Sequence, residues 1–184
     1  MELKLETMQQ VRALQIDDFF KNPNQIRECA LAQEFKPPTD DDVWLGLRSD
    51  VLDLNIGGVN VEEYIKNKIK YHLPNIPELE ITMVFHLLPE SVRGDMGNSF
   101  EYLQSHTDSE MVHFAGIVYL TPKSVRNSGT SFFADVNTKF GEIENEYNRF
   151  IFYPADIIHA PTNPFGETKD DSRLTLTFFC SIKQ

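Results

Sequence analysis

The chain has 184 residues, a length typical of one globular domain that buries roughly 70% of the surface its unfolded chain would expose. Hydrophobic residues make up 41% and charged residues 24%, which excludes an intrinsically disordered chain and a coiled coil. The 28 acidic residues outnumber the 17 basic ones, and the net charge of -11 argues against nucleic acid or an anionic membrane surface as the main partner.

The cysteines and the apolar runs bear on compartment and on metal chemistry. Cys29 and Cys180 show no CxxC spacing, so we expect two buried thiols rather than a disulfide framework or a thiolate zinc site. No apolar run approaches the roughly 18 residues of a membrane span, and the first residues alternate charges with leucines, unlike a signal peptide. We therefore expect a cytoplasmic protein. A metal would be held by nitrogen and oxygen ligands, so the five histidines are the residues to consider.

The pattern of residues 1–79 predicts a mostly helical support layer. Asn24 can cap a helix over residues 25–35 that has one apolar face and ends before a pair of prolines. A second helix is predicted over residues 61–72, with an apolar stripe on one side, and Pro74 ends it. Both helices need an apolar surface to pack on.

From residue 80 onward, short runs rich in β-branched and aromatic residues alternate with turn residues. The predicted strands are Ile81 to Leu88, Tyr102 to His106, Ala115 to Leu120, Thr130 to Ala134, Phe150 to Tyr153 and Arg173 to Ile182. Because no helix separates successive strands, a parallel crossover sheet is excluded. We expect one domain over 1–184, with an antiparallel sandwich or barrel over 80–184 and the helices on one outer face.

His106 and Asp108 are the first candidate metal ligands. On an extended backbone, residues i and i+2 project to the same side, so both side chains can reach one metal at about 2.1 Å while Thr107 points away. His159, after a strand-like run over 149–158, can supply a third ligand. Two histidines and one carboxylate on one face of a metal are the arrangement of non-haem Fe(II) oxygenases. The alternative is a hydrogen-bonded pair at a strand end and a surface histidine.

The last predicted strand carries an arginine on one face. Arg173, Thr175 and Thr177 alternate with apolar residues, and we expect the apolar side to meet the helices and the arginine to point into the barrel. A guanidinium stays charged and is costly to bury alone, so a buried Arg173 requires a planar, bidentate anion. The alternative is an edge strand with Arg173 in solvent.

The order of these motifs resembles the Fe(II)- and 2-oxoglutarate-dependent dioxygenases and is most similar to their prolyl-hydroxylase-like branch. The matching pieces are His106 and Asp108, Tyr119 within the run from Gly116 to Thr121, the run from Ser128 to Phe133, the run from Asn148 to Pro154, His159, and Arg173 followed by Thr175. They span residues 100 to 182, and their combination is more specific than any one of them. The runs over 16–23 and 44–49 also resemble small members of this group predicted in phage and bacterial genomes.

The resemblance implies a mainly β fold with N-terminal helices, a double-stranded β-helix (jelly roll, cupin-like) with the metal at one open end. The implied Fe(II) ligands, which would be the catalytic centre, are His106, Asp108 and His159. Arg173 would pair with the distal carboxylate of the co-substrate 2-oxoglutarate, and Tyr119 and Thr175 would hydrogen-bond the same carboxylate.

The implied activity is hydroxylation of an unidentified small-molecule or peptidyl substrate, with conversion of 2-oxoglutarate and O2 to succinate and CO2. Asp108 favours hydroxylation, because the halogenating branch of the family lacks this carboxylate. Two alternatives stand beside this reading: a catalytically silent, cupin-like metal or small-molecule binding protein, and a structural or interaction domain without metal affinity. Arg173 argues against the silent protein, because a pure binding module needs no co-substrate anchor.

Two further expectations concern the surroundings of the site. The turn-rich segment over 161–172 is expected at the mouth of the site. Tyr102 and Gln104 share the alternation of His106 and are expected to line the pocket.

Three other residues near these motifs are assigned weaker roles. Trp44 and Arg48 are candidates to cover the pocket, although packing beneath the helical layer suits a tryptophan better. His86, in the middle of a predicted strand, is expected as a core or surface histidine rather than as a ligand.

Overall fold

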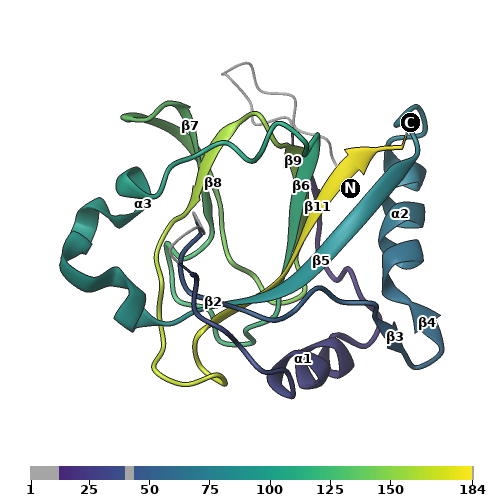
Figure 1. Cartoon of the computed structure of the whole chain (residues 1–184), viewed down its shortest axis with the longest axis horizontal. Coiled ribbons are helices and arrows are strands. Elements are labelled where there is room, and N and C mark those ends of the chain that lie inside the picture. The colour runs from purple at the N-terminus through teal and green to yellow at the C-terminus, as the bar shows by residue number, and fades with distance from the viewer. Residues whose placement is uncertain (1–12, 40–43, 184) are drawn as a thin grey trace.

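The computed structural model describes residues 13–39 and 44–183, which form two β-sheets facing each other and a helical layer (Figure 1). A six-stranded antiparallel sheet has the order β1-β9-β6-β11-β5-β2, and a three-stranded antiparallel sheet has the order β10-β7-β8. Helices α1 and α2 lie on the side of the large sheet that faces away from the small one (Figure 1). Within the described ranges, no helix combines the length and the apolar character needed to cross a bilayer.

The elements have the following bounds. The large sheet consists of β1 (Leu14–Ile16), β2 (Leu47–Arg48), β5 (Leu79–Leu88), β6 (Phe114–Tyr119), β9 (Phe150–Pro154) and β11 (Arg173–Ile182). The small sheet consists of β7 (Thr130–Asp135), β8 (Thr138–Ile143) and β10 (Ile158–Pro161), and a separate hairpin joins β3 (Asn55–Ile56) to β4 (Val59–Asn60). The helices are α1 (Pro23–Leu31), α2 (Val61–His72) and α3 (Phe100–Leu103), and a 3-10 segment, η1 (Glu90–Ser99), precedes α3.

The two long helices match the prediction to different degrees. Helix α2 has the predicted bounds, and the Asn60 side chain caps it by accepting a hydrogen bond from the Glu63 N–H at 2.9 Å. Helix α1 begins earlier and ends earlier than predicted. Its first residue is Pro23, whose fixed φ suits a helix start, and Asn24 accepts a hydrogen bond from the Tyr147 hydroxyl instead of capping. The chain leaves the helix to run beside β2, where Lys36 pairs with Arg48 through two backbone hydrogen bonds.

Five of the six predicted strands are present, and the strand predicted from Tyr102 to His106 is wrong. That segment is the end of α3 and a turn, because the Gln104 N–H donates to the Phe100 carbonyl and the Ser105 N–H to the Tyr102 carbonyl. The strand-like run over 149–158 is also two pieces rather than one. Strand β9 ends at Pro154, and the chain turns before β10 carries His159.

The outer face of the large sheet forms the main core. Leu174, Leu176 and Phe178 of β11 are buried there together with Ile26 of α1 and Ile65 of α2. The alternation expected for the last strand is therefore confirmed, with the apolar side against the helices and the side that carries Arg173 toward the small sheet. Burial of this apolar surface is the main force that fixes the strand register.

The space between the two sheets holds a smaller core and the candidate site. Tyr119 and Tyr153 of the large sheet pack there against Phe132 of β7, and the rings of Tyr153 and Phe132 meet edge to face at 5.1 Å. Both tyrosines are buried, and their polar groups point into the region where the predicted site residues lie. One part of the space between the sheets is therefore apolar, and the rest is lined by polar and charged groups.

Candidate active site

The three predicted metal ligands converge, although they do not lie on the predicted strands. His106 and His159 exchange backbone hydrogen bonds of 3.0 and 2.9 Å, and the Asp108 N–H donates to the Ala155 carbonyl at 3.0 Å. These bonds dock the segment after α3 onto the end of the small sheet. As a result, one ligand atom from each of His106, Asp108 and His159 lies within 4.8 Å of the other two.

Backbone carbonyls set the orientation of both imidazoles. Nδ1 of His106 lies 2.8 Å from the Gln104 carbonyl oxygen, and Nδ1 of His159 lies 2.9 Å from the Ile157 carbonyl oxygen. Because a carbonyl only accepts, each Nδ1 carries the proton and donates it. The other ring nitrogen, Nε2, therefore keeps its lone pair in the neutral ring, which is the form that binds a metal.

The carboxylate between them also fits a cation. Oδ2 of Asp108 is buried, has no hydrogen-bond partner among the described residues, and lies 3.8 Å from Nε2 of His159. Burial raises the pKa of Asp108, whereas burial and the neighbouring His106 lower the pKa of His159 to about 4. His159 is thus neutral near pH 7 and gives the carboxylate no compensating charge. A buried oxygen without a donor among the described residues, beside two imidazoles whose Nδ1 atoms donate to backbone carbonyls, suits a divalent ion.

A pocket opens beside the three ligands and extends between the two sheets. It is lined by His106, Asp108 and His159, and by Arg48, His86, Ala115, Ile117, Thr130, Tyr153, Pro161, Arg173, Thr177 and Phe179. Arg173 therefore shares a cavity with the possible metal ligands, and the alternative of a solvent-exposed edge arginine is wrong. Strand β11 lies between β5 and β6, so it is an inner strand.

The guanidinium of Arg173 is held by main-chain oxygens. Its Nε donates to the Ser128 carbonyl at 2.9 Å and one Nη donates to the Gly129 carbonyl at 3.1 Å, while the residue is 2% exposed. The ring of Tyr119 lies 5.4 Å from the guanidinium carbon. Because Arg173 faces only carbonyls and an aromatic ring in these contacts, its positive charge is available to an anion in the pocket.

The two other residues predicted at the co-substrate carboxylate lie behind the pocket wall. The hydroxyl of Tyr119 hydrogen-bonds the hydroxyl of Thr130 at 2.7 Å, and burial raises the pKa of this phenol. The hydroxyl of Thr175 lies 3.0 Å from that of Thr177. Thr130 and Thr177 line the pocket, whereas Tyr119 and Thr175 contact it through them. Thr177 was detectable in the sequence, because it shares the face of Arg173.

Arg48 and His86 form one wall of the pocket; the sequence offered Arg48 as a candidate to cover the pocket and expected His86 in the core or on the surface. The guanidinium carbon of Arg48 lies 4.5 Å from the Trp44 ring centre and 5.7 Å from that of Phe179. Burial, together with the charge of Arg48, lowers the pKa of His86 to about 3, and its Nε2 donates to the Leu45 carbonyl. Arg48 of β2 pairs with His86 of β5. Strand β2 has only two residues, too few to show a periodic pattern in the sequence.

Two expectations about the surroundings of the site are wrong. The segment over 161–172 lines the pocket only through Pro161; the part before Arg173 contacts Arg27 of α1, and the Lys169 ammonium donates to the Gln33 carbonyl just after this helix. Tyr102 and Gln104 are also outside the pocket, because α3 turns the Tyr102 ring toward Phe133 of the small sheet. Gln104 contributes only the carbonyl that orients His106.

Comparison with known proteins identifies the fold. No family model matches the sequence, and no curated protein sequence matches it. Among solved structures, a prolyl-4-hydroxylase from Pseudomonas putida is 15% identical, covers 95% of this chain and 94% of its own, and has a TM-score of 0.61. A 2OG-Fe(II) oxygenase family oxidoreductase from Burkholderia pseudomallei is 12% identical, with coverage of 92% and 84% and a TM-score of 0.60.

A third similar structure has a different kind of activity. The non-haem α-ketoglutarate-dependent epimerase SnoN from nogalamycin biosynthesis is 14% identical, with coverage of 94% of this chain and 77% of its own and a TM-score of 0.61. The chain therefore has the fold of the 2OG-Fe(II) oxygenases, prolyl-4-hydroxylases among them. Because one fold carries several activities, the reaction has to be argued from the site.

Proposed function

We propose that the protein is a non-haem Fe(II)- and 2-oxoglutarate-dependent dioxygenase that hydroxylates a small-molecule or peptidyl substrate. The observation that carries this proposal is the set of two imidazoles, each with Nδ1 against a backbone carbonyl, and one buried carboxylate oxygen that has no hydrogen-bond partner among the described residues, all around one point. This donor set is the one that non-haem Fe(II) oxygenases use, and it leaves coordination positions open. The proposal includes a jelly-roll core over 80–184 with the elements of 1–79 as its support, acting as one domain.

We assign one group of pocket residues to the metal and another to the co-substrate. His106, Asp108 and His159 would hold Fe(II), and Arg173 would hold the distal carboxylate of 2-oxoglutarate from deeper in the same pocket. When bound, the two groups supply the chemistry in which 2-oxoglutarate, O2 and a substrate C–H group become succinate, CO2 and an alcohol. Thr130 and Thr177 line the pocket and can donate hydroxyl hydrogen bonds to the same co-substrate. The aromatic rings of Tyr153 and Phe179 exclude water from the reacting groups.

The proposal is tested by anaerobic titration of the apo-protein with Fe(II) and then 2-oxoglutarate. We expect a weak visible charge-transfer band when both are present, and succinate after O2 is admitted. Asp108→Ala should abolish both signals, because it removes a metal ligand. Asp17→Ala is the matched control, since this carboxylate pairs with Arg149 on the surface.

The outcomes separate the proposed enzyme from its alternatives. Succinate formation by the Asp108→Ala variant would contradict the mechanism. A band in the native protein without any succinate, even when candidate substrates are added, would favour the silent binding protein. Correctly folded native protein that binds neither Fe(II) nor 2-oxoglutarate would leave only a structural or interaction role.

A further inference from the structure

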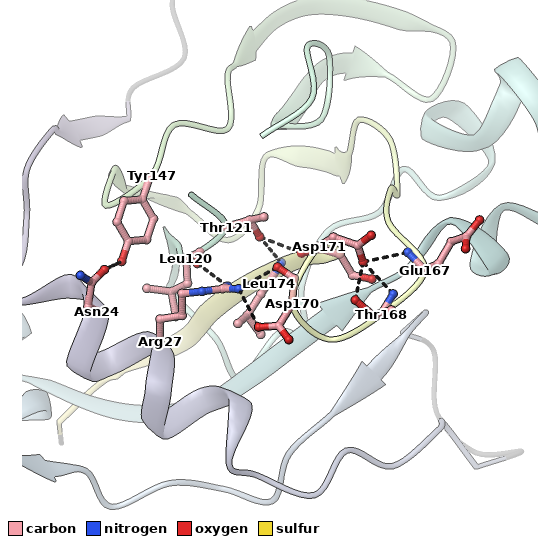
Figure 2. A network of polar contacts seen from close by, with 11 residues as sticks. Asn24, Arg27, Leu120, Thr121, Tyr147, Glu167, Thr168, Asp170, Asp171 and Leu174 are labelled. Atoms are coloured by element: carbon pink, nitrogen blue, oxygen red, sulfur yellow. Dashed lines mark hydrogen bonds and ion pairs between the residues drawn. The ribbon is translucent and has the colours of Figure 1, made fainter. Parts of the chain in front are cut away.

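The buried hydroxyl of Thr121 hydrogen-bonds the backbone on both sides of Arg173, the residue proposed to bind 2-oxoglutarate. Thr121, two residues after the end of β6, is 1% exposed. Its hydroxyl donates to the Ser172 carbonyl at 2.8 Å and accepts from the Leu174 N–H at 2.9 Å (Figure 2). These two groups belong to the peptide units immediately before and after Arg173. The Thr121 hydroxyl therefore contacts both peptide planes that flank the Arg173 α-carbon, and it orients the first of them together with the Arg173 N–H, which donates to the Phe165 carbonyl at 3.2 Å.

The direction of the Arg173 side chain depends on these two planes. Rotation of either plane would swing the Cα–Cβ bond, and a long side chain converts a small rotation into a displacement of about 1 Å at its tip. The guanidinium has little freedom to compensate, because it also donates to the Ser128 and Gly129 carbonyls. A bidentate contact with a carboxylate tolerates little misalignment.

The segments that carry this contact are braced from α1. One Nη of Arg27 donates to the Leu120 carbonyl at 2.9 Å, and the other donates to the Asp170 carbonyl at 2.7 Å (Figure 2). Leu120 directly precedes Thr121, and Asp170 lies two residues before Ser172. Arg27 thus joins the end of β6 to the loop that enters β11, on the side away from the pocket.

The loop before β11 is stabilised from within by the side chain of Asp171. Oδ1 of Asp171 accepts hydrogen bonds from the N–H groups of Glu167 and Thr168 and from the Thr168 hydroxyl (Figure 2). The Ser172 N–H donates to the Thr168 carbonyl at 3.0 Å. The residue whose carbonyl Thr121 contacts is therefore held by its own loop as well, and the Thr121 hydroxyl links this loop directly to the end of β6, beside the link through Arg27.

We infer that Thr121 is a positioning residue for Arg173 and sets the affinity of the protein for 2-oxoglutarate. The inference rests on the proposed function, since it concerns the residue assigned to the co-substrate. Thr121 contacts neither the metal ligands nor the pocket. Its loss should therefore raise the KM for 2-oxoglutarate and leave metal binding and the turnover at saturating 2-oxoglutarate unchanged.

The test compares three variants at matched positions. Thr121→Val keeps the shape and removes the hydroxyl, whereas Thr121→Ser keeps the hydroxyl and should restore the native behaviour. Thr162→Val is the control, because it also removes a buried threonine hydroxyl, one bonded to Ser131 and not to the peptides around Arg173. If Thr121→Val does not fold, Arg27→Met removes the brace behind the same contact and takes its place.

Binding of 2-oxoglutarate to Mn(II)-loaded protein is measured by calorimetry, and Mn(II) binding to apo-protein is measured separately. We expect Thr121→Val to weaken 2-oxoglutarate binding about tenfold or more, a size typical of a misplaced positioning contact. Mn(II) affinity should stay within about twofold of the native value. Native 2-oxoglutarate affinity in Thr121→Val, or an equal loss in Thr162→Val, would overturn the inference.

A second readout needs neither metal nor 2-oxoglutarate. The Nε–H of Arg173 is buried and donates to the Ser128 carbonyl, so its NMR signal should exchange slowly with solvent. The signal is identified by its absence in Arg173→Met. Thr121→Val should accelerate its exchange at least about tenfold, and unchanged exchange would overturn the inference. Native protein that shows slow exchange but binds no 2-oxoglutarate would instead contradict the proposed function.

Discussion

Replacement of His86 by glutamine should remove a large part of the loss of stability at acidic pH. His86 lies in β5 and faces the pocket, and its Nε2 donates to the Leu45 carbonyl. Glutamine can place an N–H donor near the same carbonyl but cannot titrate. Burial and the charge of Arg48 lower the pKa of His86 to about 3, whereas a histidine in the unfolded chain has a pKa of about 6.5.

The sign and size of the effect follow from this difference. Because the folded-state pKa is the lower one, the unfolded chain binds the proton first, and stability is complete above pH 6.5 and falls as the pH is lowered toward 3. At 1.36 kcal/mol per pH unit over that window, lowering the pH from about 7.5 to about 5 should cost about 2 kcal/mol through His86 alone. At pH 5 this result depends almost entirely on the unfolded-state pKa, because the folded-state pKa lies well below that pH.

The measurement is the free energy of unfolding in urea at pH 7.5 and pH 5.0 for the apo-protein. The difference between the two pH values should be about 2 kcal/mol smaller in His86→Gln than in the native chain. Contributions of the other titrating groups, such as His159, cancel in this comparison. An identical pH dependence in His86→Gln and the native chain would refute the reasoning.

Three further substitutions each test one contact of the fold by its effect on stability. Gly116→Ala should lower the free energy of unfolding by about 3 kcal/mol, measured by urea unfolding, because an added Cβ would lie 2.1 Å from Cζ of Phe178. Asn60→Ala should cost about 1 kcal/mol in the same assay, because it removes the cap of α2. Glu101→Ala should cost about 2 kcal/mol and make the chain before the metal site more sensitive to protease, because this mostly buried carboxylate holds α3 to Lys139 of β8 at 2.9 Å. A melting temperature equal to that of the native chain in any of the three would contradict the corresponding contact.

The sequence predicted best those features that a regular repeat encodes. The alternation along β11 identified both its buried apolar side and the inward direction of Arg173, because a strand has a period of two and the sheet has one face on the helices. The apolar stripe of α2 and Pro74 after it likewise predicted its bounds. His106, Asp108 and His159, which were expected to meet at one point, do lie close together, and their role as metal ligands stays a prediction.

The sequence failed where long-range contacts decide the local structure. Tyr102 to His106 has the composition of a strand, but the Tyr102 ring packs on Phe133 and the segment becomes the turn of α3. His106 and Asp108 meet because their backbone N–H groups bond carbonyls of distant residues, which no local pattern encodes. Arg48 was a candidate to cover the pocket, but its pairing with His86 was not detectable, because it lies on a two-residue strand whose register with β5 is set by long-range pairing.

The groups that contact the imidazoles of His106 and His159 and the guanidinium of Arg173 most directly include four main-chain carbonyls. The carbonyls of Gln104 and Ile157 orient the two histidines, and those of Ser128 and Gly129 hold Arg173. Every residue type carries a carbonyl, so these four positions can change identity during evolution while the site keeps its geometry. Only a handful of functional side chains then have to be retained. Sequences of this kind can drift until no family model and no curated protein matches them, as for this chain, while the fold stays recognisable at 15% identity.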